Sequence, residues 1–192
     1  GDLWIGAGCV KTLEAAAITM GEAGLAPRFS EAIQNNTIHM KDSTCPAIHT
    51  ALQASEKGVP FMPLRGLIGS DVLKNRSDWQ VIADPFDNDG GPIVLLPAIQ
   101  PDIALIHAPL ADREGNVWIG KRRELVTMAH AAKTTFVTVE KIQDENLLED
   151  DLTAAGTLPD MYVGAIAEVK PGCWPLGLAG HYQPDTSAIA EY

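Results

Sequence analysis

The sequence lacks the marks of several functional classes. Its three cysteines, Cys9, Cys45 and Cys173, lie far apart with no C-x-x-C pair, which argues against a disulfide framework and a zinc cluster. No apolar run approaches the roughly 20 residues that span a bilayer, and the first residues do not form a basic region followed by an apolar core. We therefore expect no signal peptide, no membrane partner and a cytoplasmic location.

Basic residues are also scarce. Lysine and arginine number 14 against 25 acidic residues, which gives a formal net charge of −11. Nucleic acids and anionic membranes bind basic patches, so we expect neither as a partner. With 192 residues, 46% of them hydrophobic, the chain is long enough for a single domain over residues 1–192 with a sizeable core.

Short motifs of well-known chemistries are absent as well. The sequence contains no G-x-S-x-G, no G-x-x-x-x-G-K-[ST], no G-x-G-x-x-G after a strand and no H-E-x-x-H. The histidines lie too far apart to suggest a local metal site, and most are expected at the surface or in satisfied core positions. They are His39, His49, His107, His130 and His181.

The clearest pattern that is present runs from Pro101 to Glu140. Ile103–Ile106 is typical of a buried strand, Arg122–Lys133 carries apolar residues at helical spacing, and a β-rich run follows. Strand, loop, helix and strand form the βαβ unit of a parallel sheet, whose ligands bind beyond the carboxyl ends of the strands. The polar loop 107–121, with His107 at its start, is therefore an expected functional region.

The remaining pattern predicts an α/β fold. Val10–Met20 is ambiguous, because its alanines favour a helix whereas its length suits a buried strand. Pro60 and Pro63 exclude a central strand nearby. Helices are predicted over Pro27–Asn35 and over Pro46–Lys57, and the second is capped by Ser43 or Thr44 and followed by Gly58. A hairpin turn is predicted at Asp84–Gly90. The predicted strands are Thr37–Met40, Gln80–Ile82, Ile93–Leu96 and Tyr162–Val169.

Arg65 stands in the apolar context PFMPLRGLIGSD. A guanidinium there either pairs with a buried carboxylate or binds an anionic ligand, since it can hold a carboxylate with two hydrogen bonds. Gly66, Gly69 and Ser70 would let a ligand approach backbone N–H groups. A tight turn with an internal Arg65–Asp71 pair is equally compatible with the sequence.

Cys45 lies between a predicted strand and the start of a predicted helix, a position that favours a nucleophilic thiol. His49, about one helical turn further on, could act as its base. No third group that would orient this histidine is evident, and buried cysteine is commonly inert packing. Glu22, in the turn GEAGLAP, is either a carboxylate that supports a site or a surface residue.

Several stretches, taken in order, resemble one family. They are GEAGLAPRF, GVPFMPLRGLIGSD, LLPAIQPDIALIHAPLADREGNVWIG, FVTVEKI, and a proline- and glycine-rich close ending in Tyr192. Their order over residues 20–192 resembles the A (alpha) subunit of the family I coenzyme A transferases, close to the glutaconate CoA-transferase type. The resemblance implies an α/β CoA-transferase (NagB/RpiA-like) fold with a mostly parallel sheet flanked by helices.

The resemblance also implies chemistry shared between two chains. The family moves CoA from an acyl-CoA to a carboxylic acid through a glutamate that attacks the thioester. In two-subunit members this glutamate belongs to a homologous B (beta) subunit, so no catalytic residue is expected in this chain and a heterodimer or heterotetramer is expected. Coenzyme A thioester enters as a substrate, with no permanently bound cofactor and no metal.

The matching positions suggest where substrate binds. Arg65 and the Gly66–Ser70 loop match the family's proline and arginine motif, and Gly115–Asn116 matches its glycine–asparagine turn. The alpha subunit is expected to help form an acyl pocket at the subunit interface. The substrate-binding candidates are Arg65, Gly66, Gly69, Ser70, Glu22, Cys45, His107 and Asn116.

Three features bear on how far the resemblance reaches. It implies a strand rather than a helix over Val10–Ile18. The family's alpha subunit normally starts with a strand and helix carrying a glycine-rich oxyanion loop, so the N-terminal part is apparently missing: lost, on another polypeptide, or absent. Cys45 falls near where relatives that hydrolyse or ring-open CoA thioesters carry an essential acidic residue, a role that cysteine cannot fill.

Two other hypotheses remain open. One is a subunit of the same fold that hydrolyses or ring-opens a CoA thioester. The other is a non-catalytic small-molecule-binding module, because fold alone does not decide function. The binding module ranks last because Arg65 is the only cation in the proposed pocket, whereas phosphate sites usually recruit several donors.

Overall fold

The computed structural model describes residues 1–87 and 89–192. Contacts group the chain into two compact units: the first comprises residues 1–54 and 59–98, and the second residues 55–58 and 99–192. The expectation of a single domain over residues 1–192 remains a prediction.

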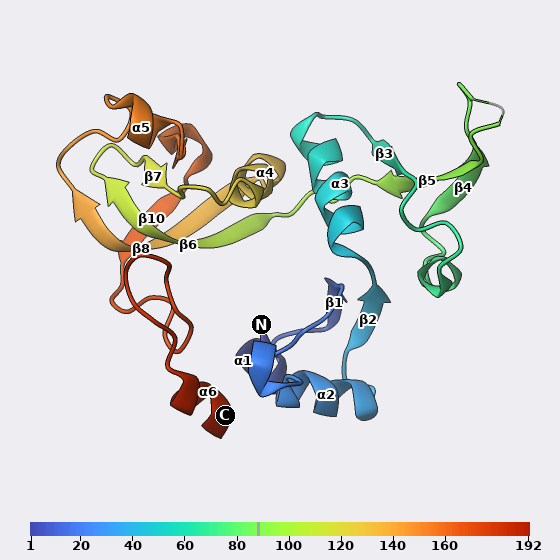
Figure 1. The fold of residues 1–192 in the computed structure, drawn as a ribbon, viewed down its shortest axis with the longest axis horizontal. Coiled ribbons are helices and arrows are strands. Elements are labelled where there is room, and N and C mark those ends of the chain that lie inside the picture. The colour runs from blue at the N-terminus through green and yellow to red at the C-terminus, as the bar shows by residue number, and fades with distance from the viewer. Residues whose placement is uncertain (88) are drawn as a thin grey trace. The chain divides into compact units, whose positions relative to one another are not determined.

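The first unit begins with a small parallel sheet. Strand β1 (Thr12–Ala15) pairs with β2 (His39–Asp42) (Figure 1). Helix α1 (Asp2–Gly6) precedes β1, and η1 (Gly21–Ala23) and α2 (Pro27–Gln34) connect β1 to β2. The strand implied by the family resemblance is thus confirmed, and the alanine-based helix alternative is wrong. Intrinsic helix propensity is a weak force that pairing with a neighbouring strand overrides.

Helix α2 is capped from a distant part of the chain. The carboxylate of Asp2, which is 7% exposed, accepts hydrogen bonds from the backbone N–H groups of Arg28 (3.2 Å) and Phe29 (2.7 Å). These N–H groups lack partners within the helix, and a carboxylate at a helix N-terminus also meets the favourable end of the helix dipole. Asp2 therefore ties α1 to α2.

Replacing Asp2 with alanine is expected to lower the free energy of unfolding by about 1 kcal/mol, as loss of a helix cap typically does. Urea denaturation measures the change. Glu31→Ala is the matched control, because Glu31 forms only an exposed pair with Arg28 on the same helix, at 3.8 Å. Equal stability of the two variants would contradict a capping role for Asp2.

Helix α3 (Cys45–Glu56) confirms the prediction for this region. The Thr44 hydroxyl accepts a hydrogen bond from the backbone N–H of Ala47 at 3.2 Å, which is one of the two caps expected. Gly58 follows the helix with φ +66°, a conformation that glycine adopts without strain.

The first unit ends in a three-stranded antiparallel sheet of order β3-β5-β4. It consists of β3 (Phe61–Leu64), β4 (Gln80–Ala83) and β5 (Pro92–Pro97), with η2 (Asp71–Asn75) between β3 and β4. Strand β3 lies at the edge of this sheet. Pro63 is tolerated there because an edge strand has one unpaired side, where the missing backbone N–H of proline breaks no hydrogen bond between strands. The predicted β4–β5 hairpin is confirmed, although Asn88 in its turn lies outside the described residues.

Arg76 joins the small parallel sheet to the segment that follows η2. Its side chain is only 3% exposed, and its guanidinium donates to Glu14 (2.7 Å) and to both carboxylate oxygens of Asp78 (2.8 and 2.9 Å) and stacks on Trp79. Its remaining bond goes to the backbone oxygen of Asp42 at 2.9 Å. A buried guanidinium with this many partners has a structural role rather than a ligand-binding one.

The second unit is built on a mixed five-stranded sheet. Its order is β10-β8-β6-β7-β9, with parallel pairs β10–β8 and β8–β6 and antiparallel pairs β6–β7 and β7–β9. The strands are β6 (Ile103–Asp112), β7 (Val117–Trp118), β8 (Thr134–Gln143), β9 (Thr157–Leu158) and β10 (Ala165–Glu168). The α/β class is confirmed, whereas a mostly parallel sheet is not.

Helix α4 (Glu124–Ala131) covers one face of this sheet (Figure 1). Residues alternate along β6, so that Ala104, Ile106 and Ala108 are buried in the core beneath α4 while Ile103 and Leu105 are about half exposed on the other face. The predicted βαβ unit is therefore present as β6–α4–β8, with β7 inserted before the helix.

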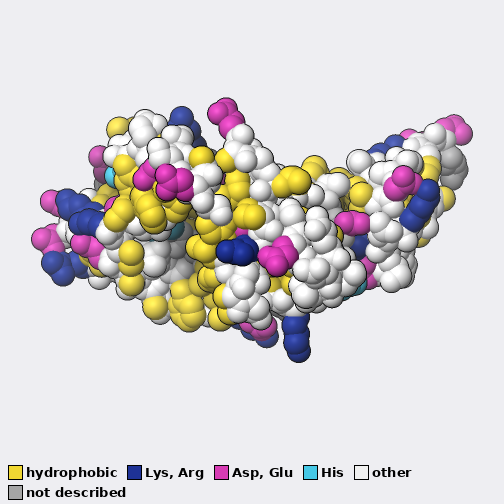
Figure 2. All heavy atoms as spheres, turned by 90° about the horizontal axis from the view of Figure 1, so that it is seen from below, with side chains coloured by type: hydrophobic (Ala, Val, Ile, Leu, Met, Phe, Trp, Pro, Cys, Tyr) yellow, Lys and Arg dark blue, Asp and Glu magenta, His cyan; other side chains and the backbone are white. Residues whose placement is uncertain are grey.

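Shorter elements complete the second unit. They are α5 (Asp151–Ala154), η3 (Asp160–Tyr162) and α6 (Thr186–Glu191). None of the helices in residues 1–87 and 89–192 is long and apolar enough to cross a membrane. On the face drawn in Figure 2, basic and acidic side chains lie in small separate groups, with no continuous basic patch.

Candidate functional site

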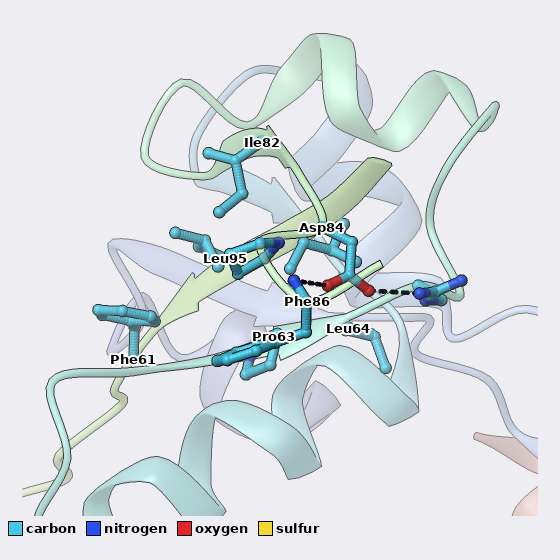
Figure 3. Close-up of a pocket in the computed structure, with 10 residues that line it drawn as sticks. Phe61, Pro63, Leu64, Ile82, Asp84, Phe86 and Leu95 are labelled. Atoms are coloured by element: carbon cyan, nitrogen blue, oxygen red, sulfur yellow. Dashed lines mark hydrogen bonds and ion pairs between the residues drawn. The ribbon is translucent and has the colours of Figure 1, made fainter. Parts of the chain in front are cut away.

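The Arg65 region of the first unit contains a pocket of about 550 Å³. Strands β3, β4 and β5 and the turn after β4 supply its walls (Figure 3). Phe61 lies at the end of the pocket opposite Asp84, with Leu95 between them. The residues that line it are Phe61, Pro63, Leu64, Arg65, Ile82, Asp84, Pro85, Phe86, Ile93 and Leu95.

Arg65 is held at the charged end of this pocket. Its Nη2 atom donates to Asp84 Oδ2 and its Nη1 atom donates to the backbone oxygen of Gly90, both at 2.5 Å. The possible Arg65–Asp71 pair is wrong, because Asp71 instead binds Lys74 at the surface. Hairpin pairing of β4 with β5 brings the true partner close, whereas Asp71 lies within the following η2 turn.

Asp84 is fixed from a second direction. Its Oδ1 atom accepts the backbone N–H of Phe86 at 2.9 Å, and the side chain is only 14% exposed. The hydrogen bond from Phe86 and the one from the Arg65 guanidinium hold the pKa of Asp84 below its ordinary value. The pair is therefore ionised at neutral pH and carries no net charge.

The glycine loop after Arg65 is a tight turn. Ile68 N–H donates to the Arg65 backbone oxygen at 3.3 Å, and Ser70 donates to the Leu67 backbone oxygen through both its N–H (3.1 Å) and its hydroxyl (2.8 Å). Gly69 has φ +84°, which explains why glycine is present there. A Cβ atom on Gly66 would meet nothing within 4 Å, so this side of the loop is open to a ligand.

His107 lies within a strand rather than at the start of a loop. Strand β6 continues to Asp112 and β7 covers Val117–Trp118, so the loop conformation predicted over 107–121 is wrong for these residues, whereas a role of the region in ligand binding remains a prediction. The alternating burial of residues 103–108 shows that the strand pattern does not stop at Ile106. His107 bonds to Thr138 through Nδ1 (2.8 Å) and to Glu140 through Nε2 (3.0 Å).

Glu140 is the centre of the His107 cluster. Its Oε1 atom accepts hydrogen bonds from Tyr182 (2.6 Å), the Gly172 N–H (2.9 Å) and His107. Burial alone would raise the pKa of Glu140, but the three donors outweigh it and lower the pKa. Burial and the bond to this carboxylate raise the pKa of Tyr182 to about 12. Both nitrogens of His107 are thus occupied within the protein.

Asn116 is also fully engaged. Its N–H (2.9 Å) and its amide Nδ2 (2.8 Å) donate to Asp112, and its Oδ1 accepts the backbone N–H of Asp160 at 3.1 Å. The residue is 2% exposed. Among the candidates, Asn116 thus shows contacts of a structural kind, closing the turn between β6 and β7.

The remaining candidates lie on the surface of the first unit. Cys45 is exposed as the first residue of α3, and no hydrogen bond joins it to the half-buried His49. Glu22 is exposed in η1. Within residues 1–87 and 89–192 the structure holds no group of three or more histidine, cysteine or acidic side chains that could bind a metal ion.

A family model described as Coenzyme A transferase matches residues 2–169. The chain belongs to the coenzyme A transferase family. It is 32% identical over 191 residues to the A subunit of the 3-oxoadipate CoA-transferase of Pseudomonas knackmussii, a match that covers 96% of this chain and 65% of the relative. It is 29% identical over 175 residues to the cholesterol ring-cleaving hydrolase IpdA subunit of Mycobacterium tuberculosis, covering 86% and 59%.

Comparison of structures leads to the same coenzyme A transferase family. The fold matches the crystal structure of glutaconate coenzyme A-transferase from Acidaminococcus fermentans with a TM-score of 0.88 and 27% identity, covering 98% of this chain and 64% of that chain. The predicted CoA-transferase fold is confirmed. The chain spans less than two thirds of the length of each of these relatives.

Sequence reasoning missed three residues that organise these sites in this coenzyme A transferase chain. From the sequence, Asp84 was interpreted only as part of a turn and Glu140 only as the end of a strand. Tyr182 belongs to a tail that was interpreted as irregular. A signal existed for one of them: Arg65 in an apolar context required a carboxylate, and Asp84 is the first acidic residue after the next strand.

Proposed function

We propose that this chain is the alpha-type part of a two-subunit CoA-transferase that moves CoA between an acyl-CoA and a carboxylic acid. The similarity to the A subunits of the 3-oxoadipate and glutaconate CoA-transferases supports this function. The Arg65 pocket would contribute to the acyl site, together with a partner B subunit. Co-expression with a partner subunit tests both the activity and the partner.

The catalytic glutamate in this proposal belongs to the B subunit. Its carboxylate attacks the thioester, which expels the CoA thiolate and leaves an acyl-glutamyl anhydride. The thiolate then attacks the glutamyl carbonyl, which forms a glutamyl-CoA thioester and releases the first acid. A second acid reverses the two steps and leaves with CoA. The one buried glutamate of this chain's His107 cluster, Glu140, is held by three donors and is unsuited to the role.

A second candidate is hydrolysis or ring opening of a CoA thioester. The similarity to the ring-cleaving hydrolase IpdA subunit favours it. Cys45 weakens it, because a thiol cannot replace the acidic residue expected near that position. Release of free CoA in the absence of any carboxylate acceptor would identify this activity.

The decisive experiment is co-expression with a B-type partner subunit. We expect CoA exchange that requires both an acyl-CoA and a free carboxylate, and borohydride trapping that modifies a glutamate of the partner. Borohydride modification of this chain would contradict the assigned division of roles. Activity of the chain alone would contradict the need for a partner.

Replacing Arg65 with alanine is expected to reduce kcat/KM of the complex about ten-fold or more, mainly through a higher KM. The substitution leaves the Asp84 carboxylate without its partner cation at the end of an otherwise apolar pocket. Lys133→Ala is the matched control, because Lys133 forms only an exposed ion pair with Asp102, at 2.7 Å. If R65A and K133A show the same kcat/KM, Arg65 does not line the acyl site.

A further inference from the structure

We propose that Asp84 makes the Arg65 pocket selective for uncharged, apolar acyl groups and against acyl groups that carry a second carboxylate. This inference rests on the proposed function and adds the substrate class to it. Arg65 is the only cation among the described residues that line the pocket, and it pairs with Asp84, a carboxylate of the protein itself.

The pocket is apolar except at one end. Apart from Arg65 and Asp84, every residue that lines it is apolar. Its volume of about 550 Å³ lies within the range of small-molecule sites. Figure 3 shows Asp84, which bonds to Arg65, at the end of the pocket that faces away from Phe61, so an apolar acyl group would contact the sheet between Asp84 and Phe61.

The guanidinium is already neutralised. Asp84 Oδ2 and the Gly90 backbone oxygen both accept from it at 2.5 Å, and the Phe86 N–H holds the other oxygen of Asp84 in place. A substrate carboxylate would therefore have to displace a fixed internal carboxylate or share the guanidinium with it. Either way the substrate loses most of the benefit of an ion pair.

A second acidic side chain lies beside the same guanidinium. A Cβ atom built on Gly90 would lie 2.5 Å from Asp87 Oδ2 and 2.7 Å from Arg65 Nη2, so both atoms flank this glycine. Asp87 therefore adds a second negative charge near this end of the pocket without forming an ion pair with Arg65, and the described residues that line the pocket include no lysine and no other arginine. Another carboxylate would meet like charge, which penalises binding.

The test compares two substrates that differ in one group. Pentanoyl-CoA and glutaryl-CoA have acyl groups of equal length, but only the second ends in a carboxylate. With the chain in complex with its partner subunit, we expect kcat/KM to favour pentanoyl-CoA at least ten-fold. Asp84→Asn should reduce this preference about ten-fold, chiefly by lowering the KM for glutaryl-CoA, because Asn keeps the acceptor for Phe86 but frees the guanidinium.

Asp71→Asn is the control, because it removes an equal charge from an exposed residue, 87% accessible, that binds only Lys74 nearby. Its substrate preference should equal that of the wild type. Asp84→Ser also keeps an acceptor for the backbone N–H of Phe86, and it replaces D84N in the comparison if D84N does not fold. A preference for glutaryl-CoA, or a ratio unchanged in both Asp84 variants, would overturn the inference.

Calorimetric titration of the same complexes separates this inference from the proposed function. If pentanoyl-CoA binds better than glutaryl-CoA and D84N removes the difference while no CoA moves, the inference stands and the transferase function fails. If CoA moves but the charge of the acyl group has no effect, the function stands and the inference fails. If neither thioester binds, both are wrong.

Discussion

Replacing Asp112 with alanine is expected to lower the free energy of unfolding by about 3–5 kcal/mol. The carboxylate is 3% exposed and accepts from Glu114 N–H (3.0 Å), Asn116 N–H (2.9 Å), Asn116 Nδ2 (2.8 Å) and Leu147 N–H (2.9 Å). Removing it leaves buried donors without partners at Asn116 and Leu147. Urea denaturation followed by far-UV circular dichroism measures the loss.

The same carboxylate gives a pH dependence of defined sign. Burial alone would raise the pKa of Asp112, but the donors from Leu147, Asn116 and Glu114 outweigh it, so that the pKa lies below its ordinary value of 3.8. A lowered pKa means that the folded state favours the ionised form. The stabilisation is therefore complete above about pH 4 and is lost as the pH falls through the lowered pKa.

Asp102→Ala is the control for Asp112. Asp102 also belongs to the second unit and forms an ion pair with Lys133, but its side chain is 81% exposed. Such pairs contribute roughly 0–1 kcal/mol. If Asp112→Ala costs no more than Asp102→Ala, or if its stability difference from the wild type does not shrink as the pH falls below the ordinary pKa of 3.8, the carboxylate does not hold this turn.

Local signals account for what the sequence predicts well. Helix α3 follows from Thr44 at its start and Gly58 beyond its end, and both signals lie within one turn of the helix. The β6–α4–β8 unit follows from the period of its apolar residues. The family resemblance adds β1, whose strand conformation depends on pairing with β2 and is invisible to alanine propensity.

Partners that are distant in sequence account for what the sequence does not predict. Arg65 and Asp84 lie 19 residues apart and meet because of the strand order β3-β5-β4. Asp71 lies closer to Arg65 in the sequence and is therefore the partner that the sequence suggests. Tyr182 and Glu140 lie 42 residues apart. The sequence indicated that Arg65 needs a carboxylate, but short-range patterns alone do not select Asp84 over Asp71 or bring Tyr182 to Glu140.

Replacing Gly172 with alanine is expected to cost roughly 3 kcal/mol of stability by overpacking and by breaking hydrogen bonds. A Cβ atom there would lie 2.0 Å from Cε1 and 2.5 Å from Nδ1 of His107, so either the His107 ring or the Gly172 backbone has to shift. The ring is held by Thr138 and Glu140, so its displacement breaks both bonds and loosens the tail that Tyr182 attaches to Glu140.

A double-mutant cycle tests this mechanism directly. His107→Ala removes the ring that the new methyl group would strike, so the combined variant should be more stable than the sum of the two single losses implies. Gly66→Ala is the matched control, because its Cβ would meet nothing within 4 Å and its stability should stay near that of the wild type. If the losses in the free energy of unfolding caused by G172A and H107A add strictly, the new methyl group does not act through the His107 ring.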